Sequence, residues 1–114
     1  MNDCLFCRII AGEINSKMVH QDDRLVAFED INPQAPHHTL ICPRVHMSTL
    51  NDVTARDEPL MGHVVRVAAE LARQMGDAEE GYRLVANTQR GAGQSVFHVH
   101  FHLMGGRTFG WPPG

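Results

Sequence analysis

Apolar and polar positions alternate in several short runs of the chain, with one long stretch of helical spacing between them. Alternation with a period of two is typical of strands that bury one face. It predicts strands over residues 17–20, 25–29, 38–43, 82–88 and 98–103. The turn residues Asp22 and Asp23 between the first two strands predict a hairpin. The two prolines within 30–36 predict a loop, because proline cannot continue a strand ladder.

Two stretches have the spacing of helices. Residues 4–12 predict a short helix that ends at a glycine, and residues 54–76 predict one long helix. Thr54 and Asp57 have the spacing of a capping box, and Gly76 suits the C-terminal stop. The apolar residues of the long helix cover more than half of its circumference, which is more than one small sheet needs. This surplus predicts a subunit interface, with deep burial inside the monomer as the alternative.

The order of these elements indicates an α+β fold with an antiparallel sheet. With 114 residues, 43% hydrophobic and 20% charged, the chain has the size of a single domain, 1–114. A net charge of −3 gives no indication of a nucleic-acid partner. No apolar run approaches the roughly 18 residues of a membrane span, and the N-terminus does not resemble a signal peptide. We therefore expect a cytoplasmic protein with no membrane partner. Residues 107–114, with the only tryptophan, are expected to dock.

The most informative stretch is the predicted strand with three histidines. His98, His100 and His102 alternate with apolar residues, so on a strand the three imidazoles share one face. Three interpretations compete: ligands of a catalytic zinc, a covalent nucleophile with tuning neighbours, or a passive metal or anion site. A plain solvated face is the remaining alternative.

The residues before this strand favour chemistry at phosphorus. Gly91, Gly93 and Ser95 offer backbone N–H groups and a hydroxyl, which suit phosphate oxygens. A nucleophilic histidine needs one bare ring nitrogen and a hydrogen bond that holds the proton on the other. The carbonyl of His98 is a candidate acceptor for the ring of His100.

Cys4-x-x-Cys7 is a second candidate site. Its spacing suits two zinc thiolates, which His46 and His98 are available to complete. The alternative is a pair of reduced cysteines without a ligand. Three cysteines are too few for a disulfide scaffold, and Cys42 is expected in the core.

Other polar residues carry weaker signals. Asp30, at the end of a predicted strand, suits either the hydroxyls of a ribose or the cap of a turn, and Asn87 has the same ambiguity. His20, His37 and His63 have no partner pattern and are expected at the surface.

The stretch His98-Val99-His100-Phe101-His102-Leu103-Met104 matches the His-φ-His-φ-His-φ-φ motif of the histidine triad (HIT) superfamily, where φ is apolar. The chain resembles its HINT branch in five further segments, 30–38, 81–83, 93–96, 105–107 and 111–114. The match runs from Cys4 to Gly114. The resemblance implies a five-stranded antiparallel sheet with one long and one short helix. It also implies a homodimer that pairs through the long helix and the 82–88 strand into a continuous sheet.

The resemblance implies a purine nucleoside phosphoramidase with a purine nucleotide substrate and no organic cofactor. Such an enzyme cleaves the P–N bond of AMP- or GMP-amine conjugates through a covalent nucleotidyl-histidine. The alternatives are a diadenosine polyphosphate hydrolase, a nucleotide-binding module without catalysis, and a metallohydrolase.

The resemblance also implies a role for individual residues. His100 resembles the nucleophile, with Ser95, His102 and His38 as the other catalytic residues. Phosphate, ribose and base would be contacted by His100, His102, Asn87, Gly93, Ser95, Asp30, Ile31, Leu5, Phe6, Ile9, Phe28 and Leu40. Some HIT proteins hold a structural zinc ion with a Cys-x-x-Cys pair and two later histidines, which match Cys4, Cys7, His46 and His98.

Overall fold

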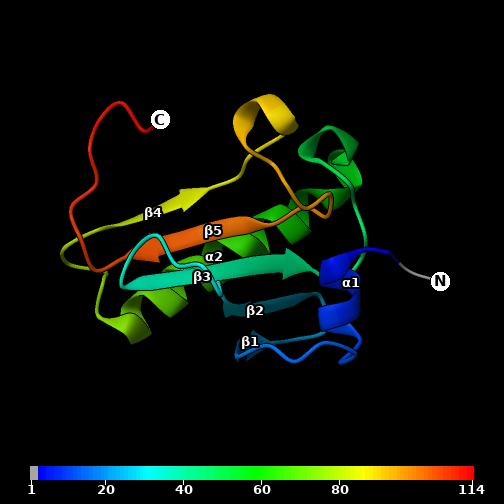
Figure 1. Cartoon of the computed structure of the whole chain (residues 1–114), viewed down its shortest axis with the longest axis horizontal. Helices are drawn as coiled ribbons and strands as arrows, with labels where there is room; N and C mark the ends of the chain where they lie inside the picture. The colour runs from blue at the N-terminus through cyan, green and yellow to red at the C-terminus, as the bar shows by residue number, and fades with distance from the viewer. Residues whose placement is uncertain (1–2) are drawn as a thin grey trace.

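A single antiparallel sheet forms the centre of the protein, which we describe over residues 3–114 of a computed structural model (Figure 1). Its five strands lie in the order β1-β2-β3-β5-β4. The strands are β1 (Met18–Gln21), β2 (Leu25–Glu29), β3 (His37–Pro43), β4 (Tyr82–Val85) and β5 (Phe101–Gly105). The expected five-stranded α+β fold with one long and one short helix is confirmed.

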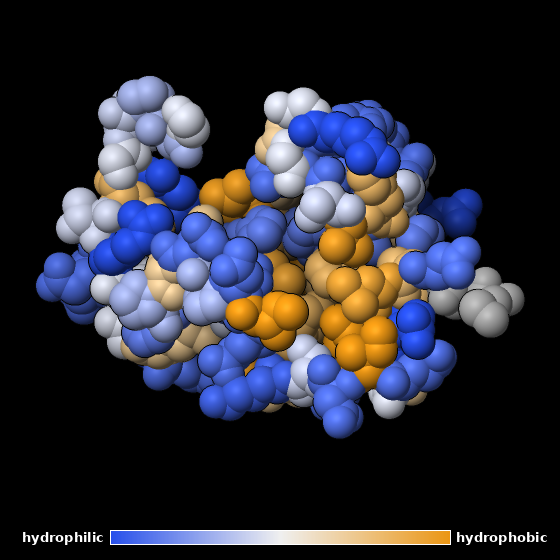
Figure 2. All heavy atoms as spheres, viewed as in Figure 1, coloured by the Kyte–Doolittle hydropathy of each residue, from blue (hydrophilic) through white to orange (hydrophobic). Residues whose placement is uncertain are grey.

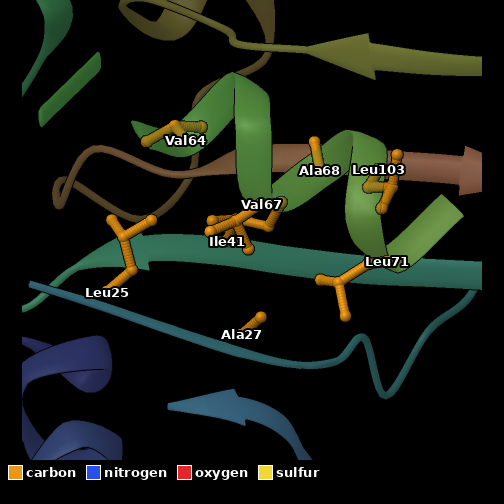
Figure 3. Packing of buried hydrophobic residues seen from close by; sticks show 8 residues of the cluster. All are labelled: Leu25, Ala27, Ile41, Val64, Val67, Ala68, Leu71 and Leu103. Atoms are coloured by element: carbon orange, nitrogen blue, oxygen red, sulfur yellow. The ribbon is translucent and has the colours of Figure 1, made fainter. Parts of the chain in front are cut away.

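The helices cover opposite faces of the sheet. α2 (Glu58–Met75) lies across the back of the sheet in Figure 1, and α1 (Leu5–Ile10) lies at the front beside β1 and β2. A first core packs between α2 and one sheet face, and Figure 3 shows Val67 of α2 against Ile41 of β3. A second core, which includes Phe6 and Ile9, packs against α1 on the other face, and the rings of Phe6 and Phe28 meet edge to face there. The alternating residues of β2 and β3 therefore supply both cores.

The long helix begins later than the sequence predicts. A 3₁₀ turn over Ala55–Asp57 precedes α2, and the Asp57 carboxylate accepts a hydrogen bond of 2.9 Å from the Thr54 N–H, as in the expected capping box. Gly76 ends α2 in the left-handed conformation, with φ of 83°. Much of the apolar surplus is buried within the monomer, but Val65 is 59% exposed. No helix in the described part of the chain is long and apolar enough to cross a membrane.

The predicted histidine strand differs most from the structure. β5 begins at Phe101, so His98 and His100 precede it in irregular backbone. In the β3–β5 register Ile41 lies opposite Phe101, and continuing it would set Val99 opposite Pro43. Proline has no N–H to donate, and the Val99 N–H instead donates to the Met47 carbonyl at 2.7 Å. The ladder therefore ends before the first two histidines.

The end of β4 and the C-terminal tail also differ from expectation. β4 ends at Val85, three residues before the predicted end at Thr88. The C-terminal tail is held at Gly110, whose carbonyl accepts a 2.7 Å hydrogen bond from Arg83 Nη2, and at Phe109, whose ring Arg83 covers at 5.1 Å. Beyond these contacts Trp111 is 85% exposed, so the expected docking of the tail holds only in part.

Candidate active site

A pocket of about 450 Å³ opens on the α1 face of the sheet, where Figure 2 shows apolar side chains gathered beside α1. One wall is apolar and the other carries imidazoles, a carboxylate and a hydroxyl. From the expected nucleotide site it brings together Leu5, Phe6, Ile9, Phe28, Asp30, Ile31, His38, Leu40, Ser95, His100 and His102. These residues come from α1, from β2 and the loop that follows it, from β3, and from β5 with the segment before it. The fold thus collects at one place residues from four separate parts of the chain.

His100 presents one bare ring nitrogen to this pocket. Its Nδ1 lies 2.7 Å from the His98 carbonyl oxygen, and since a carbonyl only accepts, Nδ1 carries the proton and donates. In the neutral ring Nε2 is then an unprotonated lone pair. Burial lowers the pKa of His100, against the His98 carbonyl and the Asp30 charge, which raise it. The edge contact with the Phe6 ring, 4.9 Å between centroids, fixes the plane of the imidazole.

His38 and His102 form a hydrogen-bonded pair in which the tautomer of each ring is defined. The Gln34 backbone N–H donates to His38 Nδ1 at 2.9 Å, so a neutral His38 carries its proton on Nε2. His38 Nε2 lies 2.9 Å from His102 Nδ1 and 3.4 Å from Asp30 Oδ2, and it donates toward them. His102 Nδ1 accepts, which leaves the proton of a neutral His102 on Nε2. His100 and His102, whose ring centroids are 5.1 Å apart, therefore hold opposite tautomers.

Burial also keeps the rings of His38 and His102 neutral. It lowers the pKa of His38, against the charge of Asp30. The pKa of His102 falls to about 4, first because the ring is buried and then because His100 and His38 repel a positive charge on it. At neutral pH the pocket therefore offers a lone pair from His100 and an N–H from His102.

The expected ribose and phosphate residues are only partly brought together. Asp30 lies at the pocket, and its Oδ1 caps a turn by accepting from the Asn32 N–H at 2.8 Å, whereas its contact with a ribose stays a prediction. Asn87 and Gly93 lie beside each other but outside the residues that line the pocket. Sequence reasoning missed Gln94, whose buried amide donates to the Ser48 carbonyl at 2.9 Å and braces the loop.

Sequence reasoning also missed the backbone N–H of Gln34, which sets the tautomer of His38. A main-chain donor leaves no side-chain signal, so no pattern in the sequence would have found it.

Cys4, Cys7, His46 and His98 form the expected cluster, with all four ligand atoms within 4.8 Å of one another. Sulfur–nitrogen distances are 3.4 Å for Cys4–His98 and 3.3 Å for Cys7–His46, and the two Nδ1 atoms are 3.2 Å apart. Tetrahedral zinc with bonds of about 2.3 Å to sulfur and about 2.0–2.1 Å to nitrogen separates S and N by about 3.6 Å and two N by about 3.3 Å. His98 Nε2 donates to the Pro43 carbonyl at 2.7 Å, which leaves Nδ1 free as a ligand. These four residues fit a zinc ion.

The three histidines that have no partner pattern in the sequence and were expected at the surface are only partly exposed, and all three have partners. His37 Nδ1 lies 2.8 Å from Asp77 Oδ2. His20 and His63 both contact Asp22. His37 and Asp77 are 40 positions apart in the sequence, and His63 and Asp22 are 41 apart. Partners so distant leave no local pattern in the sequence.

A profile of the HIT domain family matches residues 11–109. The chain is 51% identical over 108 residues to the purine nucleoside phosphoramidase of Escherichia coli (strain K12), a match that covers 95% of this chain and 91% of that protein. It superposes on a HIT family hydrolase from Legionella pneumophila Philadelphia 1 with a TM-score of 0.97 and 49% identity, over 98% of this chain and all of that one (100%). A HIT family hydrolase from Clostridium thermocellum gives a TM-score of 0.93 and 39% identity, over 96% of each chain. The profile match and the paired histidine tautomers agree with each other, and the chain belongs to the HIT domain family.

Proposed function

We propose that this chain is a purine nucleoside phosphoramidase, a hydrolase that acts on P–N bonds, built as one HIT domain over residues 1–114. The observation that carries the proposal is the pair of adjacent imidazoles in opposite tautomers, His100 with a bare Nε2 and His102 with a protonated one. A nucleophile and an electrophilic donor side by side suit attack on a phosphorus centre. The Escherichia coli relative with 51% identity is named for this activity.

The first step transfers the nucleotide to the enzyme. The lone pair of His100 Nε2 forms a bond to the α-phosphorus while the bond from phosphorus to the amine nitrogen breaks. The amine leaves as a neutral molecule only if it gains a proton, and Ser95, exposed at the pocket, relays that proton from solvent. The His102 Nε2–H donates to a phosphoryl oxygen and stabilises the charge that develops there.

The second step releases the product. Water attacks phosphorus and gives one proton to solvent, the bond to His100 Nε2 breaks with its electron pair returning to the nitrogen, and the nucleoside monophosphate leaves with the neutral imidazole restored. The hydrogen bond from His100 Nδ1 to the His98 carbonyl stabilises the positive charge that the ring carries while it is nucleotidylated. A ring that is disfavoured as a cation by burial is also a good leaving group in this step.

We place the base and the ribose of the nucleotide by the chemistry of the two pocket walls. The apolar wall of Leu5, Phe6 and Ile9 suits a flat purine, and Asp30 suits the two ribose hydroxyls. Asn87 and Gly93 lie outside the pocket lining, so we assign them to the phosphate only as part of the loop that carries Ser95.

We further propose that Cys4, Cys7, His46 and His98 hold a structural zinc ion. The agreement of their separations with tetrahedral geometry supports this assignment. When bound, zinc supplies a cross-link between α1, the loop after β3 and the segment before β5. It takes no part in the chemistry at phosphorus.

A homodimer is also part of the proposal. β4 is an edge strand, and the neighbouring α2 exposes Val65. An edge strand near a helix that exposes an apolar side chain suits a second copy that continues the sheet.

The test is the covalent intermediate. His100→Ala is expected to abolish both turnover and the mass increase of one AMP unit when protein is mixed with an adenosine phosphoramidate. An AMP adduct on that variant in intact-mass spectrometry would refute the assignment. Parallel assays with a phosphoramidate and a diadenosine polyphosphate separate the two hydrolase activities, because the proposal expects the first to be cleaved faster. Tight AMP binding without turnover would indicate a binding module.

A further inference from the structure

A second cluster of potential metal ligands lies on the opposite side of the sheet from the pocket. The Nε2 atoms of His20 and His63 each lie 2.7 Å from Asp22 Oδ2. All three ligand atoms lie within 4.8 Å of one another. A separate cavity of about 290 Å³ opens beside them between the β1–β2 hairpin and α2. None of the three residues lines the active-site pocket.

A β-bulge turns His20 toward this cluster. Met18 lies opposite Phe28, so a regular ladder would set His20 opposite Val26, which belongs to the core under α1. The register shifts between Met18 and His20, and His20 lies opposite Ala27, a residue of the core under α2. Bulges commonly re-aim a side chain in this way. The irregularity therefore brings this imidazole to the face where His63 lies.

Asp22 is held in place by contacts that leave one oxygen for the histidines. Its Oδ1 accepts from the backbone N–H groups of Arg24 and Leu25, both at 2.8 Å, and its carbonyl accepts from Arg44 Nε at 2.6 Å. Burial opposes its ionisation, but these backbone donors and the two imidazoles together hold the pKa of Asp22 well below its usual range. The carboxylate is thus both ionised and fixed, with Oδ2 directed at two rings.

The third residue comes from the helix. His63 stands in the second turn of α2, and its side chain is only 9% exposed. Two imidazoles and one carboxylate, from a hairpin and a helix, converge on one point. This is the donor set of zinc and neighbouring first-row divalent ions, whereas calcium and magnesium prefer oxygen ligands alone.

We propose that His20, Asp22 and His63 form a second binding site for a divalent transition metal ion, with zinc as its probe. Binding shifts the proton of each ring from Nε2 to Nδ1, so that Nε2 turns from a donor into a ligand and no net proton is lost. The N–O separations then widen from 2.7 Å to about 3.3 Å around a tetrahedral ion. The fourth position faces the cavity, where water completes the coordination.

The surroundings do not oppose a cation. The cavity is also lined by Arg24 and Arg66, and two acidic residues, Asp23 and Glu70, balance them. Bound metal would link the β1–β2 hairpin to α2, so the site would stabilise the fold and is independent of the proposed reaction.

The experiment counts zinc. Wild type, His63→Gln and His20→Gln are dialysed against zinc chloride, and zinc per chain is measured by elemental analysis. Both variants are expected to hold one ion fewer than wild type. His37→Gln is the matched control, because it removes an imidazole that pairs with a single carboxylate at 2.8 Å. It is expected to match wild type. The same difference is expected in a Cys4→Ser/Cys7→Ser background, which separates this site from the cysteine cluster.

Equal zinc contents in all the variants would overturn the proposal. Since His63 is nearly buried, His63→Gln risks misfolding, and a second readout uses the unmodified chain. Zinc titration followed by NMR of the imidazole nitrogens is expected to shift the Nε2 signals of His20 and His63 together, while those of His37 stay in place. If the signals of His20 and His63 do not change at saturating zinc, the three residues form only a hydrogen-bonded contact between the hairpin and α2, and the proposal is wrong.

Discussion

His38 offers a direct test of the assigned tautomers, because its two ring nitrogens make two different hydrogen bonds. Nδ1 accepts from the Gln34 N–H, and Nε2 donates to His102 Nδ1, both at 2.9 Å. The amide of His38→Gln sets an N–H near the position of Nε2 and loses the acceptor. The amide of His38→Asn sets an oxygen near the position of Nδ1 and loses the donor. The two variants therefore remove one bond each.

The structure allows the size of each effect to be estimated. Leaving a buried polar group without its partner costs about 1–3 kcal/mol. In His38→Asn the group left without a partner is His102 Nδ1, and the ring is free to move its proton onto that nitrogen. The donor to the phosphoryl oxygen is then lost, so kcat/KM is expected to fall roughly 5- to 150-fold. In His38→Gln the loss falls on the Gln34 loop and stability, and kcat/KM should drop less than in His38→Asn.

The assay combines phosphoramidate kinetics with NMR of the His102 ring nitrogens. Wild type should show a protonated Nε2 and a bare Nδ1, and His38→Asn should show a mixture. His37→Gln is the control, since the neighbouring ring is bound to Asp77 and lies outside the pocket lining. Because His38 is buried, circular dichroism must first show that each variant is folded. Equal kcat/KM in both His38 variants, or a His102 ring with its proton on Nδ1 in wild type, would refute the reasoning.

Three further outcomes are expected. Cys4→Ser/Cys7→Ser should lose one zinc ion by elemental analysis and lower the Tm, while a phosphoramidase assay still detects turnover because His100 is retained. Asp22→Ala should lower the free energy of unfolding, measured in urea, by about 2–4 kcal/mol, because four hydrogen bonds end on its carboxylate. Its control is Asp23→Ala, which removes a side chain that is 92% exposed and should change the free energy of unfolding by less than about 0.5 kcal/mol. The pKa of His102 falls to about 4 on folding, so the unfolded chain binds more protons between that value and about 6.5. Stability should therefore be complete above pH 6.5 and decline as pH falls toward 4, by at most about 3 kcal/mol from this ring, and His102→Asn should flatten the decline in urea titrations at several pH values.

The sequence was sufficient for the elements whose signals are local. Alternation in 25–29 and 38–43 identified β2 and β3, and the spacing up to Gly76 identified α2. The cysteine cluster was predicted because Cys-x-x-Cys has a characteristic spacing, and the geometry now agrees with it. For these strands and this helix the residues that decide the outcome lie within a few positions of one another, as do Cys4 and Cys7, whereas His46 and His98 were assigned through the resemblance to HIT proteins.

Features that depend on tertiary partners were not predicted. The start of β5 depends on Pro43, which lies in another strand, and the pairing of His63 depends on a hairpin 41 residues away. The bulge at His20 has no marker such as glycine in the sequence. Periodicity gives the face of a residue only while the ladder continues, and it cannot show where a partner strand stops donating.

The early end of the β5 ladder is itself connected to the proposed chemistry. In a regular strand the carbonyl of His98 would point along the ladder at a neighbouring N–H group. In the register His98 would face β4, and because β4 ends at Val85 no strand partner takes that carbonyl, which accepts from His100 Nδ1 instead. The ring of His98 is meanwhile fixed between the Pro43 carbonyl and the cysteine cluster. One residue thus anchors the segment through its ring and sets the tautomer of the nucleophile through its backbone. The spacing of two between His98 and His100 therefore serves this local hydrogen bond, and not a shared strand face.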